Sequence, residues 1–230
     1  AIQHFDSILT DSSVVVYPDS AKPDGVKAAI VETQIPQEDI LGFCKTNDIT
    51  VGSYFQAVFA ETVSRLTREA NPLYVTINNG RSANVELLHS VGMYVKTLPV
   101  GLTSKLAEHK DVVGFAKTMH EQLQSSYAND IYPYTKMVEK YGVRAEILYI
   151  YQGGIADNAS VSGIEQVDLA LDTTKFALSI FVYPIGNDYT IRIEYDGMRY
   201  GKQDMRVLAE TIGTAAQNMT KADNLRDVEL

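Results

Sequence analysis

The side chains that most often carry acid–base or metal chemistry are few in this sequence and lie far apart. Four histidines could each act as a general base or a metal ligand: His4, His89, His109 and His120. None of them lies in an H-E-x-x-H motif, and no two are one helical turn apart. We therefore expect structural or surface roles for all four, and the sequence predicts no catalytic residue and no metal site.

A thiol and a pair of carboxylates are the remaining candidates. The single cysteine, Cys44, lies among apolar residues on a predicted helix, which favours a small buried hydrophobic residue over a nucleophile. One cysteine also excludes an intramolecular disulfide and a cysteine-clustered metal site. Glu194 and Asp196 share one face of a predicted strand, but paired carboxylates on an exposed strand are usually only solvated.

Motifs that bind nucleotides or present a nucleophile are absent. No two glycines are spaced as G-x-G, and there is no G-x-x-x-x-G-K, so the dinucleotide fingerprint, the kinase glycine loop and the P-loop are excluded. No serine lies in G-x-S-x-G, the elbow of many hydrolases. The chemistry-bearing residues alone thus indicate no reaction, and the elements that would position them must be considered.

The composition is that of an ordinary globular protein. The 230 residues are 45% hydrophobic and 21% charged, and the net charge is -9. Because the basic residues are scattered, we expect no nucleic-acid partner. No apolar stretch approaches the roughly 18 residues of a membrane helix, so we expect no membrane partner. The chain begins without a basic and apolar leader, which predicts a cytoplasmic location.

Hydrophobic periodicity predicts several amphipathic helices. The clearest starts at Thr50, a good N-cap, and ends before Asn71-Pro72. Asp111 is a second candidate N-cap. Pro36 and the acidic residues after it indicate the first turn of a shorter helix. The predicted helices span residues 36–47, 50–66, 111–127, 135–141 and 203–219.

Short β-branched runs predict the strands. They span residues 28–33, 73–77, 92–100, 147–151, 164–171, 176–185 and 189–195. Gly186-Asn187-Asp188 is a plausible hairpin turn between the last two. Residues 17–25, rich in proline and glycine, are typical of a linker or crossover. Helices and strands interleave without strict alternation, so we predict an α+β fold (an α/β sandwich) with helices packed on a mixed β-sheet.

Several segments carry a more specific pattern. They are the helix 50–66 followed by YVTINNGR (74–81), VGMYVKTLPV (91–100), NDIYPY (129–134), Tyr195-Asp196, and the closing residues 224–230. Residues 16–19 (VYPD) and Lys22-Pro23 fit a segment that enters the second lobe of a two-lobed domain. In this order, the series resembles the C-terminal half of a condensation domain from non-ribosomal peptide synthetases.

The resemblance implies one lobe of a chloramphenicol acetyltransferase-like fold, in which two lobes meet around a tunnel. It implies that residues 1–25 are the end of a preceding lobe and a crossover linker, and that residues 26–230 are the C-terminal lobe. The family's catalytic motif, histidine-histidine-x-x-x-aspartate-glycine, belongs to the first lobe, and this sequence contains none. The implied partners are therefore the N-terminal lobe and peptidyl carrier domains, which deliver phosphopantetheine, with no cofactor bound directly.

The resemblance also implies contacts with the substrate tunnel or the carrier arm. They are Asn79, Gly80, Arg81, Tyr94, Lys96, Thr97 and Ser179. For Arg81 a structural salt bridge is favoured over contact with a carrier arm. For Gly92, Tyr94 and Thr97 packing is favoured, because aromatic and β-branched residues suit a strand. Lys96 and Gly101 depart from the asparagine and arginine of the family, and lysine cannot accept a hydrogen bond.

Two other functions remain open from the sequence. One is a module that binds a carrier or a peptide without chemistry. The other is an acyltransferase that uses coenzyme A, in which one of the four histidines acts as the base; loss of acetyl transfer on replacing His89 or His120 with alanine would support it.

Overall fold

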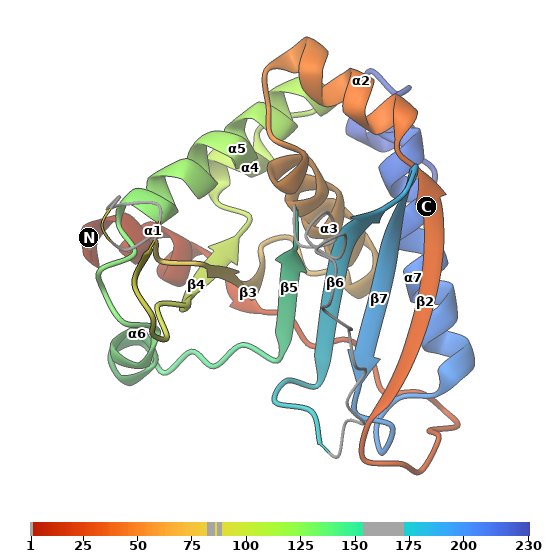
Figure 1. Cartoon of the computed structure of the whole chain (residues 1–230), viewed down its shortest axis with the longest axis horizontal. Coiled ribbons are helices and arrows are strands. Elements are labelled where there is room, and N and C mark those ends of the chain that lie inside the picture. Colours follow the sequence, from red (N-terminus) through yellow and green to blue (C-terminus); the bar gives the residue numbers. More distant parts are fainter. Residues whose placement is uncertain (1, 82–85, 87–88, 154–172) are drawn as a thin grey trace.

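The computed structural model describes residues 2–81, 86, 89–153 and 173–230, and within them a seven-stranded sheet organises the chain. The strand order is β1-β3-β5-β6-β7-β2, and β4 pairs with β3 off this path. Figure 1 shows α3 and α7 behind the part of the sheet formed by β5, β6, β7 and β2. The strands are β1 (Ser13–Val14), β2 (Ala29–Pro36), β3 (Pro72–Asn78), β4 (Lys96–Gly101), β5 (Ile147–Tyr151), β6 (Leu178–Ile185) and β7 (Asp188–Tyr195).

The helices connect and cover these strands. They are α1 (Ile2–Asp11), α2 (Glu38–Asn47), α3 (Val51–Thr67), α4 (Ser104–Ala107), α5 (Val112–Ala128), α6 (Tyr134–Tyr141) and α7 (Lys202–Asn218), with a short 3₁₀ helix at Leu225–Asp227. Strands β1, β3, β5 and β6 run parallel, whereas β4, β7 and β2 pair antiparallel with their neighbours. The predicted mixed sheet with packed helices is thus confirmed.

Helix α3 lies at the centre of the larger core. Its residues from Ser53 to Ala60 are all buried, because helices, strands and loops surround it. The Phe59 ring stacks on the Tyr149 ring at a centroid distance of 4.6 Å and meets the Tyr74 ring edge-on at 4.9 Å. Aromatic pairs of this geometry add to the free energy of burial. Helix α3 is therefore anchored to β3 and β5 through aromatic side chains.

The first helix was not predicted. In α1, Phe5, Ile8 and Leu9 are buried and pack with Leu73, Leu98 and Met137 in a second hydrophobic cluster. Their spacing is helical, but the stretch is short and has no N-cap signal. Strand β1 pairs with β3 in the sheet, and α1 packs against β4 of the same sheet. Residues 2–14 are therefore part of this unit in the structure. The assignment of residues 1–25 to the end of a preceding lobe stays a prediction.

Two predicted boundaries are wrong, and one predicted strand is not described. Residues 92–95 precede the strand that was predicted over 92–100, because β4 begins only at Lys96. Pro36 ends β2, paired with Asp188, and does not begin α2. A proline is tolerated there because β2 is an edge strand of the described sheet. The predicted strand 164–171 lies outside the described residues.

The histidines and the cysteine lie in separate places. The Cys44 side chain is 3% exposed, and its burial raises the pKa of the thiol to about 12. Three histidines form hydrogen bonds with hydroxyl groups: His4 with Ser125 and Ser126, His109 with Thr118, and His120 with Ser53, while His89 is exposed.

Among the described residues, no three His, Cys, Asp or Glu side chains are grouped so that they could hold a metal ion. Over the same residues, every helix is too short or too polar to cross a bilayer.

Both predicted N-caps are confirmed, and one of them allows a test. The Thr50 hydroxyl accepts the Ser53 N–H, and the Asp111 carboxylate accepts the Gly114 N–H at 2.6 Å. We expect Asp111→Ala to lower the free energy of unfolding by about 1 kcal/mol at pH 7, measured by urea denaturation. Asp111→Asn, which also caps well, is expected to change it by only a few tenths of a kcal/mol.

The same contact makes the effect depend on pH. The hydrogen bond from Gly114 lowers the pKa of Asp111 below its usual value, so this group favours the folded state when it is ionised. The part of its contribution that depends on the charge is complete above the unfolded-state pKa, near 4, and disappears as the pH falls through the lower folded-state pKa. An equal loss for Asp111→Ala at pH 7 and at pH 2 would contradict this role.

Candidate functional site

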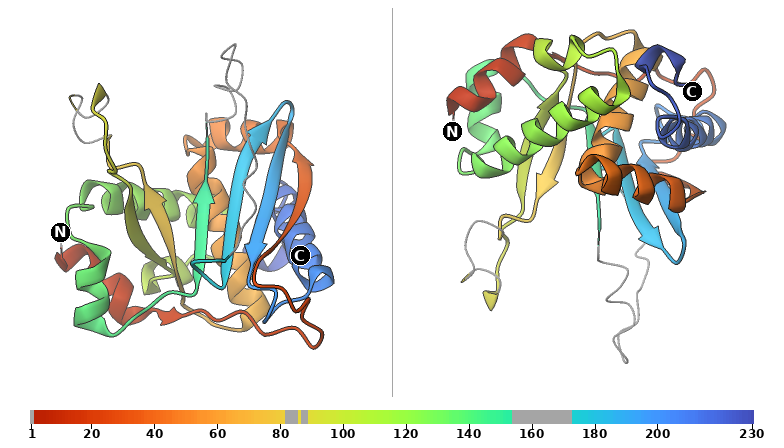
Figure 2. Two further views of the ribbon diagram at one scale, coloured as in Figure 1. Left: turned by 60° about the horizontal axis from the view of Figure 1, so that its bottom comes forward. Right: turned by 90° about the horizontal axis from the view of Figure 1, so that it is seen from above.

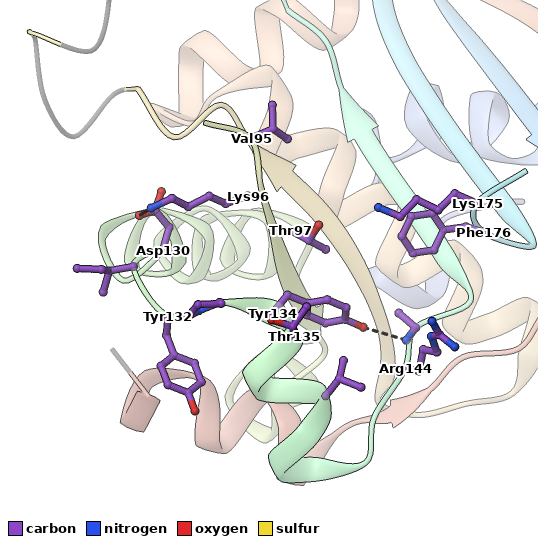
Figure 3. Close-up of a pocket in the computed structure, with 14 residues that line it drawn as sticks. Val95, Lys96, Thr97, Asp130, Tyr132, Tyr134, Thr135, Arg144, Lys175 and Phe176 are labelled. Carbon is purple, nitrogen blue, oxygen red and sulfur yellow. Dashed lines mark hydrogen bonds and ion pairs between the residues drawn. The ribbon is translucent and has the colours of Figure 1, made fainter. Parts of the chain in front are cut away.

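A cavity of about 650 Å³ opens beside β4, and we call it the β4–α6 pocket. Its lining comes from Val95 and the start of β4 (96–97), the turn into α6 (130–135), Val138, and the segments that lead into β5 (144–145) and β6 (175–176). Figure 3 shows these side chains around one opening. Cavities of this size hold small-molecule ligands.

Local sequence features position the walls of the β4–α6 pocket. The extended backbone of Pro133 forms the N-cap of α6, and Gly142, in the left-handed region at φ 67°, ends the helix. The Tyr134 hydroxyl accepts the Ala145 N–H at 3.0 Å, which ties the start of α6 to the segment leading into β5 (Figure 3). Two segments eleven residues apart are thereby held on one side of the opening.

One carboxylate in the lining is already paired. Asp130 receives a hydrogen bond from the Lys96 ammonium at 3.1 Å and another from the Asn78 amide at 2.8 Å. The Asp130 side chain is only 10% exposed, and that of Lys96 is 38% exposed. Because the carboxylate is nearly buried, the pair and the amide are needed to offset its desolvation. An ion pair therefore connects the first residue of β4 to the turn after α5.

The other ionisable side chains in the lining are the cations Arg144 and Lys175 and the phenols of Tyr132 and Tyr134. Arg144 and Lys175 are exposed, and Lys175 lies with its ammonium 5.7 Å from the centroid of the Phe176 ring. Burial raises the pKa of Tyr134, and the Ala145 N–H and the Arg144 charge oppose this only in part. The Tyr134 hydroxyl therefore stays neutral near pH 7. The described lining can bind and orient a polar or anionic ligand.

A second cluster of predicted residues orders the loop next to the pocket, and we call it the arginine loop (residues 79–81 and 90–94). The Arg81 guanidinium donates to the carbonyls of Ser90 at 2.7 Å and Gly92 at 2.9 Å, and it lies 4.4 Å from the centroid of the Tyr94 ring. The Asn79 amide oxygen accepts the Arg81 N–H. Arginine thus organises the backbone of this loop, as a residue with several donors in a fixed plane can do.

Two apolar side chains of the arginine loop are almost fully exposed. Val91 and Met93 are 101% and 89% exposed, although both are hydrophobic. Figure 2 shows the described residues just before β4 extending beyond the sheet and the helices. Exposed apolar residues next to each other commonly mark a surface that another protein or domain covers.

The structure separates the seven predicted site residues into three places. Lys96 and Thr97 line the β4–α6 pocket. Asn79, Gly80, Arg81 and Tyr94 belong to the arginine loop. Ser179 lies buried in β6, with Leu148 and Glu194 as its strand neighbours, and outside the pocket lining. Contact of any of them with a ligand stays a prediction.

Sequence reasoning missed three charged residues of the lining. Asp130 falls within the NDIYPY segment, but it was not singled out because its partner, Lys96, is 34 residues away. Arg144 and Lys175 lie in connecting segments, where exposed cations are ordinary. His89 and His120, the candidate bases of a coenzyme A-dependent enzyme, are not among the described lining residues.

The chain is similar to a known family over almost its whole length. A family model described as Condensation domain matches residues 17–228. A curated relative, one of the linear gramicidin synthase proteins of Brevibacillus parabrevis, is 31% identical over 99 residues, which are 43% of this chain and 1% of that protein. The nonribosomal peptide synthetase ataP of Aspergillus terreus is 32% identical over 98 residues, which are 42% of this chain and 6% of its own length. The chain thus corresponds to a very small part of these relatives.

Solved structures share the fold. The X-domain from teicoplanin biosynthesis aligns with 100% of this chain and 56% of its own, at a TM-score of 0.81 and 10% identity. The condensation domain of the Monacolin K polyketide synthase MokA aligns with 94% of this chain and 55% of its own, at a TM-score of 0.74 and 14% identity. In each case the matched part is about half of the solved chain, and the predicted α+β fold is confirmed.

Proposed function

The chain belongs to the condensation-domain family, and from this premise we propose that residues 26–230 act as the C-terminal lobe of a condensation domain in a peptide synthetase. In this proposal the lobe contributes half of the tunnel in which carrier-bound aminoacyl or peptidyl thioesters are joined by an amide bond. In this proposal residues 1–25 are the end of the preceding lobe and a crossover linker, whose α1 and β1 pack with the C-terminal lobe. Coverage of about half of the solved neighbours supports a one-lobe assignment.

The observation that carries the proposal is that separate motif segments line one cavity, the β4–α6 pocket. Two segments that resemble family motifs, 91–100 and 129–134, lie far apart in the sequence, and both contribute to its lining. A third, 74–81, supplies Asn78, which holds Asp130 in place. Motif segments that converge on one cavity are expected where a ligand is bound. The pocket is therefore the proposed wall of the tunnel.

The chain is proposed to act as a template rather than as the catalytic half. Amide formation from a thioester needs the amine nucleophile placed against the acyl carbon. It also needs a group that accepts the proton of the amine or stabilises the charge that develops. The sequence contains no histidine-histidine-x-x-x-aspartate-glycine motif, so this group is assigned to the other lobe. Phosphopantetheine arms of carrier domains bring both substrates, and no cofactor is needed in the chain itself.

The exposed tip of the arginine loop supports a domain partner. Val91 and Met93 would lose much of their unfavourable exposure if another surface covered them. We assign the N-terminal lobe of the same domain as that surface, because the arginine loop leads directly into Val95 and the start of β4, which line the proposed tunnel wall. The β4–α6 pocket would then be closed by the other lobe.

Reconstitution tests the proposal. We expect amide formation between two carrier-loaded aminoacyl groups when the chain and the lobe encoded upstream of it are co-expressed, and none from either part alone. The control is the same pair with the second histidine of the upstream motif replaced by alanine, which should associate without reacting. Amide formation by the chain alone, or association without any transfer by the unaltered pair, would contradict the proposal. Micromolar binding of a carrier by the chain alone, without transfer by the pair, would instead favour the non-catalytic module.

A further inference from the structure

The β4–α6 pocket has a charge opposite to that of the whole chain. The net charge of the chain is -9, yet the described lining contains three cations, Lys96, Arg144 and Lys175, and one carboxylate, Asp130. Lys96 and Asp130 neutralise each other at 3.1 Å. Two positive charges therefore remain at the wall of a cavity in an acidic protein.

Arg144 and Lys175 are available to a ligand. Within the described part of the chain neither side chain has a carboxylate partner, and the Lys175 ammonium lies 5.7 Å from the centroid of the Phe176 ring. In Figure 3 both residues lie on the side of the opening across from Lys96 and Asp130. Cations with no carboxylate partner beside apolar surface attract anions more strongly than cations on open surface, because the surrounding dielectric is lower.

The rest of the lining indicates the shape of that anion. Aromatic and aliphatic side chains form much of the wall, among them Tyr132, Tyr134, Val138 and Phe176. Such surface covers an apolar stem, whereas the two cations suit a charged end. Arginine can bind a carboxylate through two parallel N–H···O hydrogen bonds, and lysine adds a point charge.

We propose that the β4–α6 pocket selects an acyl or aminoacyl unit whose apolar stem ends in a carboxylate, held by Arg144 and Lys175. This inference rests on the proposed function, since it names the class of substrate that the tunnel wall receives. The carboxylate of the substrate is favoured over the phosphodiester of the carrier arm. The phosphodiester adjoins a chain of polar amides, which would lose hydrogen bonds to water where they lie against the aromatic and aliphatic side chains of the wall.

Binding of two matched probes to the 230-residue chain tests the inference. The probes are pantetheine thioesters of glutaric acid, one ending in a free carboxylate and the other in the neutral amide. We expect the carboxylate probe to bind about 10-fold more tightly in NMR titrations at low ionic strength, since a charge-assisted contact contributes more than a neutral one. In Arg144→Gln/Lys175→Gln the two probes should bind equally.

The control variant separates the site from the overall charge. Lys27→Gln/Lys117→Gln removes the same charge from exposed positions outside the pocket lining, and it should keep the preference for the carboxylate. Equal binding of the two probes to the unaltered chain overturns the inference, as does loss of the preference in the control variant. Phosphopantetheine without an acyl group provides the other arm of the test. If it binds as tightly as the carboxylate probe and is weakened by the Arg144→Gln/Lys175→Gln change, the cations serve the phosphate and the inference is wrong.

The outcomes also distinguish this inference from the proposed function. Equal binding of the two thioesters removes the inference but leaves a site for carrier-delivered thioesters. Binding of neither probe also removes it, while amide formation by the reconstituted lobes would still support the proposed function.

Discussion

Phe59→Ala is expected to lower the free energy of unfolding by about 3–5 kcal/mol, the range for removing a buried aromatic side chain. Phe59 is 1% exposed, and its ring packs on Tyr149 and Tyr74. Alanine would leave a cavity between α3 and the sheet that the surrounding residues cannot fill. Because whole domains are stable by only about 5–15 kcal/mol, the loss should be visible as a large shift in the urea midpoint.

Two control variants give the Phe59 result its meaning. Phe59→Leu keeps most of the apolar volume and should cost only about 1–2 kcal/mol. Leu66→Ala, at a 37% exposed position of the same helix, should change the stability by about 0.5 kcal/mol or less. A Phe59→Ala loss no larger than that of Leu66→Ala would show that α3 is not the centre of the core.

Gly80→Ala is expected to disrupt the arginine loop. Backbone strain and a steric clash should lower the free energy of unfolding by about 2–4 kcal/mol. Gly80 has φ 67°, and a Cβ atom there would overlap the backbone carbonyl of Tyr94. A carbonyl cannot move aside as a flexible side chain can, so β3 and β4 would separate where Asn78 pairs with Lys96. Backbone amides at the Asn78–Lys96 end of the β3–β4 pair should exchange hydrogen faster. The carboxylate thioester probe should also bind the β4–α6 pocket more weakly.

Gly142→Ala is the matched control for Gly80→Ala. Gly142 has the same φ of 67°, but a Cβ atom there would meet no other atom within 4 Å. Its cost is therefore the conformational strain of a left-handed alanine alone, about 1 kcal/mol. Equal losses for the two variants, measured by urea unfolding, would show that the contact with Tyr94 contributes nothing.

Much of the fold could be predicted because its signals are local. The N-caps at Thr50 and Asp111 act on amides within three residues, and the apolar spacing of α3 and α7 repeats every turn. The turn between β6 and β7 follows from Gly186, whose φ of 59° few other residues adopt. Where local signals were weak, as in α1, or ambiguous, as at Pro36, the prediction failed.

The candidate site was only partly predictable. The resemblance indicated Lys96 and Thr97, which do lie in the β4–α6 pocket, and Arg81, which organises the neighbouring loop. It did not indicate Arg144 or Lys175, because an isolated cation in a connecting segment has no pattern. Their position in the pocket lining becomes visible only when the segments leading into β5 and β6 are placed beside β4 and α6.

The types of element, the caps, the central helix and the family to be considered could all be read from the chain, since each depends on neighbouring residues or on motifs in a given order. The three-dimensional arrangement was needed to show that β2 joins the sheet beside β7, more than 150 residues later, and that Asp130 pairs with Lys96 and Asn78. The same is true of the two cations that face the cavity. Packing between distant segments minimises exposed apolar surface and unpaired charge for the whole chain at once, and no local pattern records the result.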